Sequence, residues 1–327
     1  MATAPHWFIA ATIPAGRFSA VPGTNDTHAL RVSHLSKRYG EVVAVRDASF
    51  EVEPGEIFGI IGPNGAGKTT TVECLQGLRD PDQGELSVLG LDPRTQGSAL
   101  RNRIGSQLQE SALPDRIRVW EALDLFGALS PRSRSWASLA RDWDIYEKRN
   151  SAFASLSGGQ RQRLFIALAL VNDPELVFLD EMTTGLDPAA RRLAWDLVRA
   201  VRERGTTVVL VTHFMDEAEA LCDRIAVFRH GDVVAVDTPA GLIERVAAGS
   251  TVTFTADDSD LPWLAEVPGV DEVSREGTRF AVSGRGPLLA HVASALVARG
   301  IAPLDLDTRR ATLEDAFMEL SGGDDAA

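Results

Sequence analysis

One eight-residue segment limits the folds open to this chain more than any other feature. The apolar run Ile57–Ile61 is followed directly by Gly62-Pro63-Asn64-Gly65-Ala66-Gly67-Lys68-Thr69, which fits the phosphate-loop pattern. Glycines in such a loop let backbone N–H groups face the phosphates, and the N-terminus of the next helix adds partial positive charge. Lys68 can reach the β and γ phosphates, Thr69 can hold Mg²⁺, and Thr70 completes the binding segment. The segment predicts an α/β nucleotide-binding fold.

A second apolar strand carries two carboxylates at its end. Residues 176–179 are Leu-Val-Phe-Leu, and Asp180 and Glu181 follow them. Open parallel sheets bind ligands at the carboxyl ends of their strands, so both side chains are expected near the phosphates. Asp180 would support Mg²⁺, whereas Glu181 would orient or deprotonate an attacking water. A nucleotide and Mg²⁺ are therefore the expected ligands.

The segment Leu156-Ser157-Gly158-Gly159-Gln160 predicts a second anion site. It places a serine hydroxyl and exposed glycine amides at the start of a helical run, which is a suitable arrangement for binding a phosphate. One chain would then carry two phosphate-binding helix starts but a single phosphate loop. This indicates that two chains share each nucleotide.

Apolar patterning divides the chain into two domains. From residue 30, short apolar segments alternate with helical stretches, which is typical of an α/β domain with buried strands. We assign residues 28–247 to this domain, with a helical subdomain at about residues 110–172. Residues 225–228 and 233–236 flank His230, Gly231 and Asp232, which predicts a hairpin.

The pattern changes at about residue 248. Residues 248–321 are expected to form a small α+β domain with the order β-α-β-β-α-β, the ferredoxin-like arrangement. Residues 1–27 are rich in Ala, Pro, Gly and Thr and show no apolar period, so they are interpreted as a flexible extension, and residues 322–327 as a tail.

Composition excludes several classes of protein. The net charge is −13, so general binding to duplex nucleic acid is disfavoured, and we expect no nucleic-acid partner. The first 16 residues contain no Lys, Arg, Asp or Glu, but they are too few to span a bilayer, which takes about 20 apolar residues. They also lack the basic start of a secretory signal, which favours a cytoplasmic protein. The two cysteines, Cys74 and Cys222, suggest neither a disulfide framework nor a zinc site.

These motifs, in this order and spacing, closely resemble the ATP-binding subunits of ABC transporters. The phosphate loop lies at residues 62–69, the family's signature at 156–160 and its Walker B strand ends at Asp180 and Glu181. The resemblance covers about residues 30–237. It implies an ABC ATPase nucleotide-binding domain that hydrolyses ATP.

The resemblance also implies roles for four further residues. Tyr39 matches the aromatic residue that stacks on adenine, with a plain strand-end tyrosine as the alternative. Gln109 matches the Q-loop glutamine that senses Mg²⁺ and the water, although Gln107 is a rival for this role. Asp187 looks like the D-loop aspartate that meets the opposite subunit, and it can also cap a helix that starts at Pro188. His213 matches the histidine that contacts the γ-phosphate. Where many relatives have proline after the catalytic glutamate, this chain has Met182.

The family mechanism implies partners. Two copies would enclose two ATP molecules, each held by Lys68, Thr69 and Asp180 of one chain and by Ser157 and Gly159 of the other. Intact motifs allow a homodimer, and a heterodimer also stays open. Closure and release would act on a separate transmembrane permease through residues 109–120. The chain would then lie at the cytoplasmic face of the membrane.

Two segments indicate the direction of transport. Residues 212–219 and 312–317 resemble the drug-exporter branch, in particular the daunorubicin-resistance type of ATPase, which pairs with a separate ABC-2 type permease. This implies export of a drug or another hydrophobic compound. The alternatives are the ATPase of an importer, for example of methionine, and a soluble ABC ATPase acting on ribosomes or DNA. An adaptor that binds ATP without hydrolysing it is disfavoured by the presence of Glu181 and His213.

Overall fold

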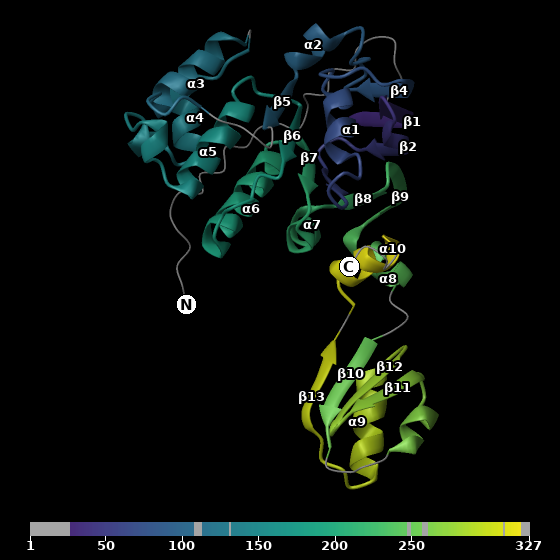
Figure 1. Ribbon diagram of the computed structural model, residues 1–327. Coiled ribbons are helices and arrows are strands. Elements are labelled where there is room, and N and C mark those ends of the chain that lie inside the picture. Colours follow the sequence, from purple (N-terminus) through teal and green to yellow (C-terminus); the bar gives the residue numbers. More distant parts are fainter. Residues whose placement is uncertain are drawn as a thin grey trace. The chain divides into compact units, whose positions relative to one another are not determined.

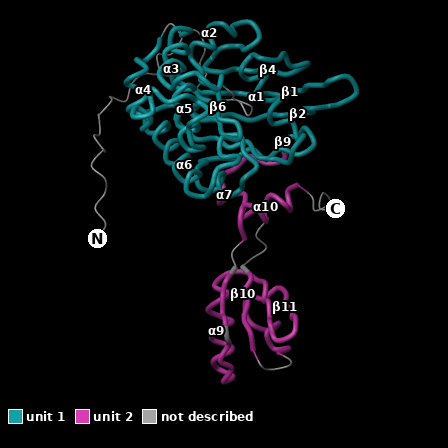
Figure 2. Tube along the Cα trace, turned by 60° about the vertical axis from the view of Figure 1, so that its left-hand side comes forward, with its two compact units in different colours: residues 1–233 teal, residues 234–327 magenta. Residues whose placement is uncertain are grey.

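The computed structural model describes residues 27–107, 113–130, 132–246, 250–256, 261–309 and 311–321 (Figure 1). The chain forms two compact units, residues 1–233 and residues 234–327 (Figure 2). The first unit is an α/β assembly built on a large sheet, and the second contains a small antiparallel sheet with helices. The expected α/β nucleotide-binding fold is therefore present.

Within the described residues, the large sheet has nine strands in the order β4-β1-β2-β9-β8-β3-β7-β6-β5. The strands are β1 (Leu30–Tyr39), β2 (Val42–Val52), β3 (Ile57–Ile61), β4 (Gln83–Val88), β5 (Ile104–Gln107), β6 (Leu176–Asp180), β7 (Thr207–Thr212), β8 (Arg224–Arg229) and β9 (Asp232–Asp237). β1 pairs antiparallel with β2 and β4, whereas β8, β3, β7, β6 and β5 are parallel.

The central strands explain why the sequence forms this sheet. Every residue of β3, β6 and β7 is buried, as expected for parallel strands covered on both faces. Ile57 is in register with Val208, and Phe178 with Val209. Since these strands are parallel neighbours, the residues that follow Ile61, Asp180 and Thr212 emerge at the same edge of the sheet.

Helices surround this sheet and form a separate group after β5. The helices of the first unit are α1 (Lys68–Leu75), α2 (Gly97–Arg101), α3 (Val119–Ala128), α4 (Trp136–Asp142), α5 (Gly158–Ala169), α6 (Pro188–Glu203) and α7 (Met215–Leu221), with the 3-10 turns η1 (Tyr146–Lys148) and η2 (Phe153–Ser155). α6 and α7 pack on β7, while α3, α4 and α5 pack on one another. The latter three fall within residues 110–172, where the sequence indicated a helical subdomain.

A tight turn joins β8 to β9, at the hairpin expected from the sequence. His230 and Gly231 both have a positive φ, 48° and 87°, as a two-residue type I′ turn requires. Gly231 O accepts a hydrogen bond from Arg46 N at 2.7 Å, which attaches the turn to β2.

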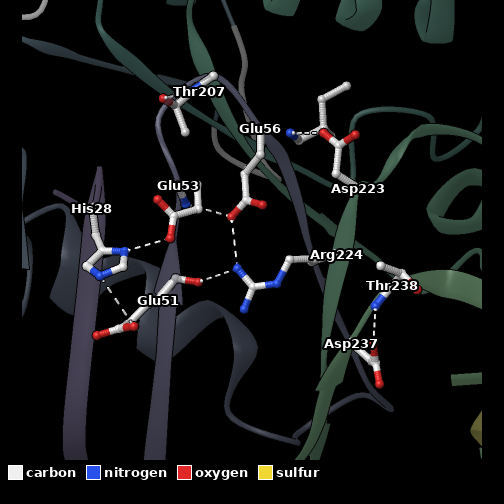
Figure 3. A network of polar contacts seen from close by, with 11 residues as sticks. His28, Glu51, Glu53, Glu56, Thr207, Asp223, Arg224, Asp237 and Thr238 are labelled. Atoms are coloured by element: carbon white, nitrogen blue, oxygen red, sulfur yellow. Dashed lines mark hydrogen bonds and ion pairs between the residues drawn. The ribbon is translucent and has the colours of Figure 1, made fainter. Parts of the chain in front are cut away.

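A polar network stabilises the edge of the sheet where β3 and β8 begin (Figure 3). Glu56 is buried there, and its Oε1 accepts a hydrogen bond from Glu53 N at 2.7 Å. Arg224 Nη1 contacts the same oxygen at 3.4 Å and also donates to Glu51 O at 3.2 Å. His28 lies between Glu51 and Glu53, with 2.9 Å from its Nδ1 to Glu53 Oε1. The network lies at the amino-terminal ends of the strands, so we assign it to stability.

The second unit contains a four-stranded antiparallel sheet of order β11-β12-β10-β13. Its elements are α8 (Pro239–Val246), β10 (Ser250–Thr255), η3 (Pro262–Glu266), β11 (Val270–Glu276), β12 (Arg279–Gly284), α9 (Leu288–Ala298), β13 (Leu304–Arg309) and α10 (Leu313–Leu320). Phe254 and Phe280 stack with ring centroids 5.3 Å apart in its core. A 3-10 turn stands where the sequence indicated the first helix.

Two helices of this unit pack on each other outside the small sheet. α8 contacts α10, whose start is capped because Thr312 Oγ1 accepts a hydrogen bond from Asp315 N at 3.2 Å. From the sequence, residues 239–246 were expected in the nucleotide-binding domain, because the apolar pattern changes at about residue 248. In the structure α8 belongs to the second unit, since its apolar partner α10 lies there. The expected extension at residues 1–27 and the tail at 322–327 lie outside the described residues, except for Thr27.

Candidate active site

The phosphate loop joins β3 to α1 in a backbone shape that requires glycine. Gly67 has φ 99°, and a Cβ atom there would lie 2.4 Å from Ala44 O. A Cβ on Gly62 would lie 2.6 Å from Phe228 O. Both neighbours are backbone atoms that cannot move away, so the glycines hold the loop against the sheet. Asn64 and Gly65 are exposed at the opposite side of the loop.

Lys68 is folded back into this loop. Its Nζ donates to Gly62 O at 2.7 Å and to Pro63 O at 3.0 Å, and the residue is only 6% exposed. Burial lowers the pKa of the ammonium, while the charges of Glu181 and Asp180 oppose that shift. The lysine therefore faces the two carboxylates predicted to share its site. A phosphate group would offer it charged acceptors in place of two carbonyl oxygens.

Asp180 is the last residue of β6 and is buried, with 4% of its surface exposed. Burial and then the charge of Glu181 raise its pKa to about 6, although Lys68 acts in the opposite direction. Its Oδ1 is buried and has no hydrogen-bond partner among the described residues. A carboxylate in this condition is suited to a cation that is not part of the chain.

The donor set fits Mg²⁺ bound together with a nucleotide. Among the described residues, no group of three or more His, Cys, Asp or Glu side chains could hold a metal by itself. Mg²⁺, however, is usually held by one or two carboxylates together with water and substrate phosphates. Asp180 supplies an unpaired carboxylate oxygen, and Thr69 is exposed in the first turn of α1, next to Lys68. Thr70 follows it and is half-buried.

Glu181 and His213 form a contact across two strand ends. Glu181 has φ 47°, in the left-handed region, and its N–H donates to Val211 O of the neighbouring strand at 2.9 Å. Its Oε1 lies 3.2 Å from Nδ1 of His213, the residue that follows β7. Backbone strain of this kind costs about 1–3 kcal/mol and is concentrated at functional sites. The pair can hold a water molecule or a terminal phosphate in a fixed position.

The signature residues form a second, separate helix start. Ser157 caps α5: its Oγ accepts from Gln160 N at 3.4 Å, and Gln160 Oε1 accepts from Ser157 N at 3.1 Å. Ser157 and Gly158 are exposed, and Gly159 is half-buried. Within the described part of the chain, no hydrogen bond joins residues 157–160 to the phosphate loop. One chain therefore presents two separate helix starts, at Lys68 and at Gly158, that the sequence predicts to bind phosphate.

Asp187 and Tyr39 are placed by their own local structure. Asp187 caps α6, because its Oδ1 accepts from Ala189 N and Ala190 N at 2.9 Å each. Tyr39 ends β1 and is 39% exposed. Its ring has Lys37 Nζ at 5.6 Å and Arg79 Cζ at 5.4 Å from the centroid. An exposed ring between two cations can stack on a planar base that carries phosphates.

Gln109, the predicted Q-loop residue, lies outside the described residues. Its rival Gln107 is described: it ends β5, is buried, and its Oε1 accepts from Gln162 Nε2 at 3.2 Å. Neither Gln162 of α5 nor the buried Glu217 of α7 was singled out from the sequence. The signals for these two residues in the sequence are weak. Gln162 is a second glutamine just after the signature, and Glu217 is an acidic residue in the first turn of a helix.

The fold and this edge of the sheet define a nucleotide-binding protein with a phosphate loop. A family model described as ABC transporter matches residues 45–184. The Nod factor export ATP-binding protein I of Ralstonia nicotianae (strain ATCC BAA-1114 / GMI1000) is 37% identical over 313 residues, which cover 92% of this chain and 96% of that protein. The daunorubicin resistance ATP-binding protein DrrA2 of Streptomyces coeruleorubidus is 36% identical over 310 residues, 91% of this chain and 96% of that one.

Solved structures agree with these sequence matches. A structure described as an ATP binding subunit of an ABC transporter has a TM-score of 0.59 and 28% identity, and the match covers 66% of this chain and 92% of that one. The dimeric structure of MJ0796, a bacterial ABC transporter cassette, has a TM-score of 0.57 and 27% identity, and the match covers 64% and 98%. The chain belongs to the ABC transporter family, as an ATP-binding subunit. It is an ATP hydrolase. None of its described helices is both long enough and apolar enough to cross a membrane.

Proposed function

We propose that this chain powers the export of a drug or another hydrophobic compound through a separate ABC-2 type permease. The observation that carries the proposal is the extent of the match to two export or resistance ATP-binding proteins. Each match covers more than 90% of this chain and 96% of the relative, so it includes the second unit as well as the nucleotide-binding unit. The chain would act at the cytoplasmic face of the membrane.

Two copies of the chain complete the site in this proposal. Lys68 turns from Gly62 O and Pro63 O toward the β and γ phosphates of ATP, and Tyr39 stacks on the adenine. Ser157 and Gly159 of the second copy face the γ-phosphate from the other side. Support comes from the two separate helix starts of one chain, at Lys68 and at Gly158, and from the dimeric structure of a related cassette with ADP and Pi, which is 25% identical with a TM-score of 0.58.

Hydrolysis is assigned to the residues at the ends of β6 and β7. Glu181 accepts a proton from the attacking water, and His213 holds both the carboxylate and the terminal phosphate in place. Thr69, Asp180 and Gln109 would hold Mg²⁺, which would supply positive charge next to the phosphate oxygens. Asp187 meets the opposite chain, so that each site is complete only when the two copies close. Loss of the γ-phosphate removes the contacts that hold them together.

A hollow in the first unit supports the proposal that the chain binds a permease. Its volume is about 570 Å³, and its lining comes from residues of α2, β5, α3 and α5, including Gln107. Phe126 and Leu129 line it and are exposed, Leu129 by 76%. The lining is mixed, with polar side chains such as Ser98 and Asn172 beside Phe126 and Leu129. A hollow of this kind, beside the strand that leads to Gln109, can receive a helix of a membrane protein that carries both polar and apolar side chains. Movement of the Q-loop would then reach the partner directly.

Purification of the full chain from its native membrane in mild detergent tests this proposal. Mass spectrometry identifies the bound proteins, and ATP hydrolysis is measured on the same sample. We expect a permease and no external binding protein. A permease together with an external binding protein would make the chain part of an importer. Recovery of ribosomes or DNA-repair proteins without a permease would overturn transport and leave only the ATPase.

A further inference from the structure

Glu217 is a fully buried carboxyl close to the site that the mechanism above does not use. It lies in the first turn of α7, four residues after His213, and is 0% exposed. Trp195 Nε1 of α6 donates to its Oε1 at 3.2 Å, but Oε2 is buried without a hydrogen-bond partner in the described part of the chain. Burying a carboxyl with one oxygen unpaired destabilises a fold, and an apolar side chain would pack there without that cost. Packing alone therefore does not explain the residue.

The surroundings of Glu217 link three segments of the site. Burial raises the pKa of its carboxyl, whereas the hydroxyls of Thr212 and Thr183 and the indole of Trp195 favour the ionised form. Thr212 ends the strand before His213, and Thr183 follows Glu181 and Met182. Thr183 Oγ1 is itself buried without a hydrogen-bond partner among the described residues. Thr183 Oγ1 and Glu217 Oε2 thus both lack a hydrogen-bond partner among the described residues, and the segments that carry them approach each other. A small shift would let Thr183 donate a hydrogen bond to Glu217.

Other contacts make α6 and α7 a single unit. Arg191 Nη1 of α6 lies 3.2 Å from Asp216 Oδ2 of α7, and its Cζ lies 4.3 Å from the ring centroid of Phe214. Arg199 Nη2 donates to Ala220 O at 3.2 Å. α6 begins at Asp187, and α7 begins just after His213. These contacts connect the helix that begins after Asp187 with the helix that begins just after His213.

We propose that Glu217 is a positioning residue that couples the segment from Thr183 to Asp187 with His213. When a second chain meets Asp187, the segment shifts, Thr183 donates to Glu217 Oε2, and the Glu181–His213 pair is fixed for hydrolysis. The inference rests on the roles proposed above for Glu181, His213 and Asp187. It adds that Glu217, which touches neither ATP nor the attacking water, orients the Glu181–His213 pair.

Kinetics of the purified full chain test the coupling. Glu217→Leu removes both carboxyl oxygens and keeps an apolar body, so we expect kcat to fall at least tenfold. The KM for ATP should change less than twofold, and the melting temperature should change little, because removal of the buried carboxyl offsets the loss of the hydrogen bond from Trp195. Glu217→Gln keeps an acceptor for Trp195 and a polar group for Thr183, and should retain kcat within threefold. Glu219→Gln, exposed on the same helix, is the matched control and should behave as wild type.

Thr183→Val isolates the proposed hydrogen bond. Its effect on kcat should match that of Glu217→Leu, and the double variant should be no worse than either single variant. Wild-type kcat in Glu217→Leu would overturn the inference, as would a loss of kcat accompanied by weaker ATP binding and a lower melting temperature, since that pattern describes a folding role alone. Glu181→Gln serves as the separate test: full turnover in that variant would refute the proposed catalytic roles themselves, whatever Glu217 does.

Discussion

Nδ1 of His213 and Oε1 of Glu181 are 3.2 Å apart, and this contact connects the ends of two neighbouring parallel strands. It depends on the left-handed backbone of Glu181, which directs the chain away from β6 one residue after Asp180. Adjacent residues thereby take different environments: Asp180 stays buried, and Glu181 meets the histidine. The carboxyl of Asp180 is therefore suited to a metal ion, and that of Glu181 to a water molecule.

The first prediction concerns the general base. Glu181→Gln keeps the size of the side chain but cannot accept a proton, so we expect kcat to fall about 100-fold or more. ATP binding should persist, because Lys68 and the loop are unchanged. Steady-state hydrolysis and equilibrium ATP binding measure the two quantities. Glu203→Gln, exposed near the end of α6, should leave both quantities at wild-type values. Turnover at the wild-type rate in Glu181→Gln would show that Glu181 is not the general base.

A second prediction follows from the pKa of Asp180, which is raised from 3.8 to about 6. Between these values the folded chain holds a proton that the unfolded chain releases, so stability falls as pH rises through this window. Asp180→Asn removes the effect. In Mg²⁺-free and nucleotide-free buffer it should stabilise the protein by up to about 3 kcal/mol at pH 7.5 and roughly half as much at pH 5.

Denaturant unfolding of the wild type and of Asp180→Asn at the two pH values measures this difference in stability. The other carboxylates titrate alike in both proteins, so their contribution cancels. Asp196→Asn on the surface of α6 should change stability by no more than about 0.5 kcal/mol at either pH. An equal gain for Asp180→Asn at both pH values would show that its charge is not the cause.

Adenine stacking gives a third prediction. Tyr39→Ala removes the ring and should weaken ATP binding about tenfold, in line with the roughly 1–3 kcal/mol of a base–aromatic contact. Tyr39→Phe keeps the ring and should bind within twofold of wild type. Calorimetric titration in a Glu181→Gln background avoids hydrolysis during the measurement. Unchanged affinity in Tyr39→Ala would leave Tyr39 as an ordinary strand-end residue.

Local chemistry made the phosphate loop and the strand carboxylates predictable. The glycines of residues 62–67 specify a backbone shape by themselves, and the apolar run before Asp180 specifies a buried strand. The same holds for Asp187, whose capping hydrogen bonds involve only its own helix. The functional roles given to these residues from the family resemblance remain predictions.

Features created by packing between distant segments could not be predicted. The burial of Glu217 depends on α6 lying against α7, and no pattern within residues 215–221 encodes that. The domain boundary raised the same difficulty, because α8 packs on α10, which lies about 70 residues further along the chain. A 3-10 turn, Pro262–Glu266, stands where a short helix was expected.

A fourth prediction concerns the close contact between β5 and α5. A Cβ on Gly105 would lie 1.9 Å from Ala169 O, a backbone atom at the end of α5. Gly105→Ala should therefore destabilise the protein by about 3 kcal/mol or more, above the usual cost of overpacking. Gly97→Ala would meet only the flexible end of Arg101 and should stay within about 1 kcal/mol of wild type. Denaturant midpoints measure the stability of the two variants. If Gly105→Ala were as stable as Gly97→Ala, α5 would be able to shift away from β5 and the prediction would be wrong.

The last prediction tests the hollow proposed to receive the permease. Leu129 is 76% exposed and lines it, so Leu129→Asp adds a charge to the docking surface with little effect on the folded chain. We expect at least tenfold less permease to co-purify, because a buried, unpaired carboxylate opposes an apolar contact. ATP affinity should be unchanged, since Leu129 is not among the residues assigned to the nucleotide. Leu193→Asp places the same charge on exposed α6 and should leave co-purification intact. If both variants lose the permease equally, the added charge acts through general repulsion and the hollow is not the docking site.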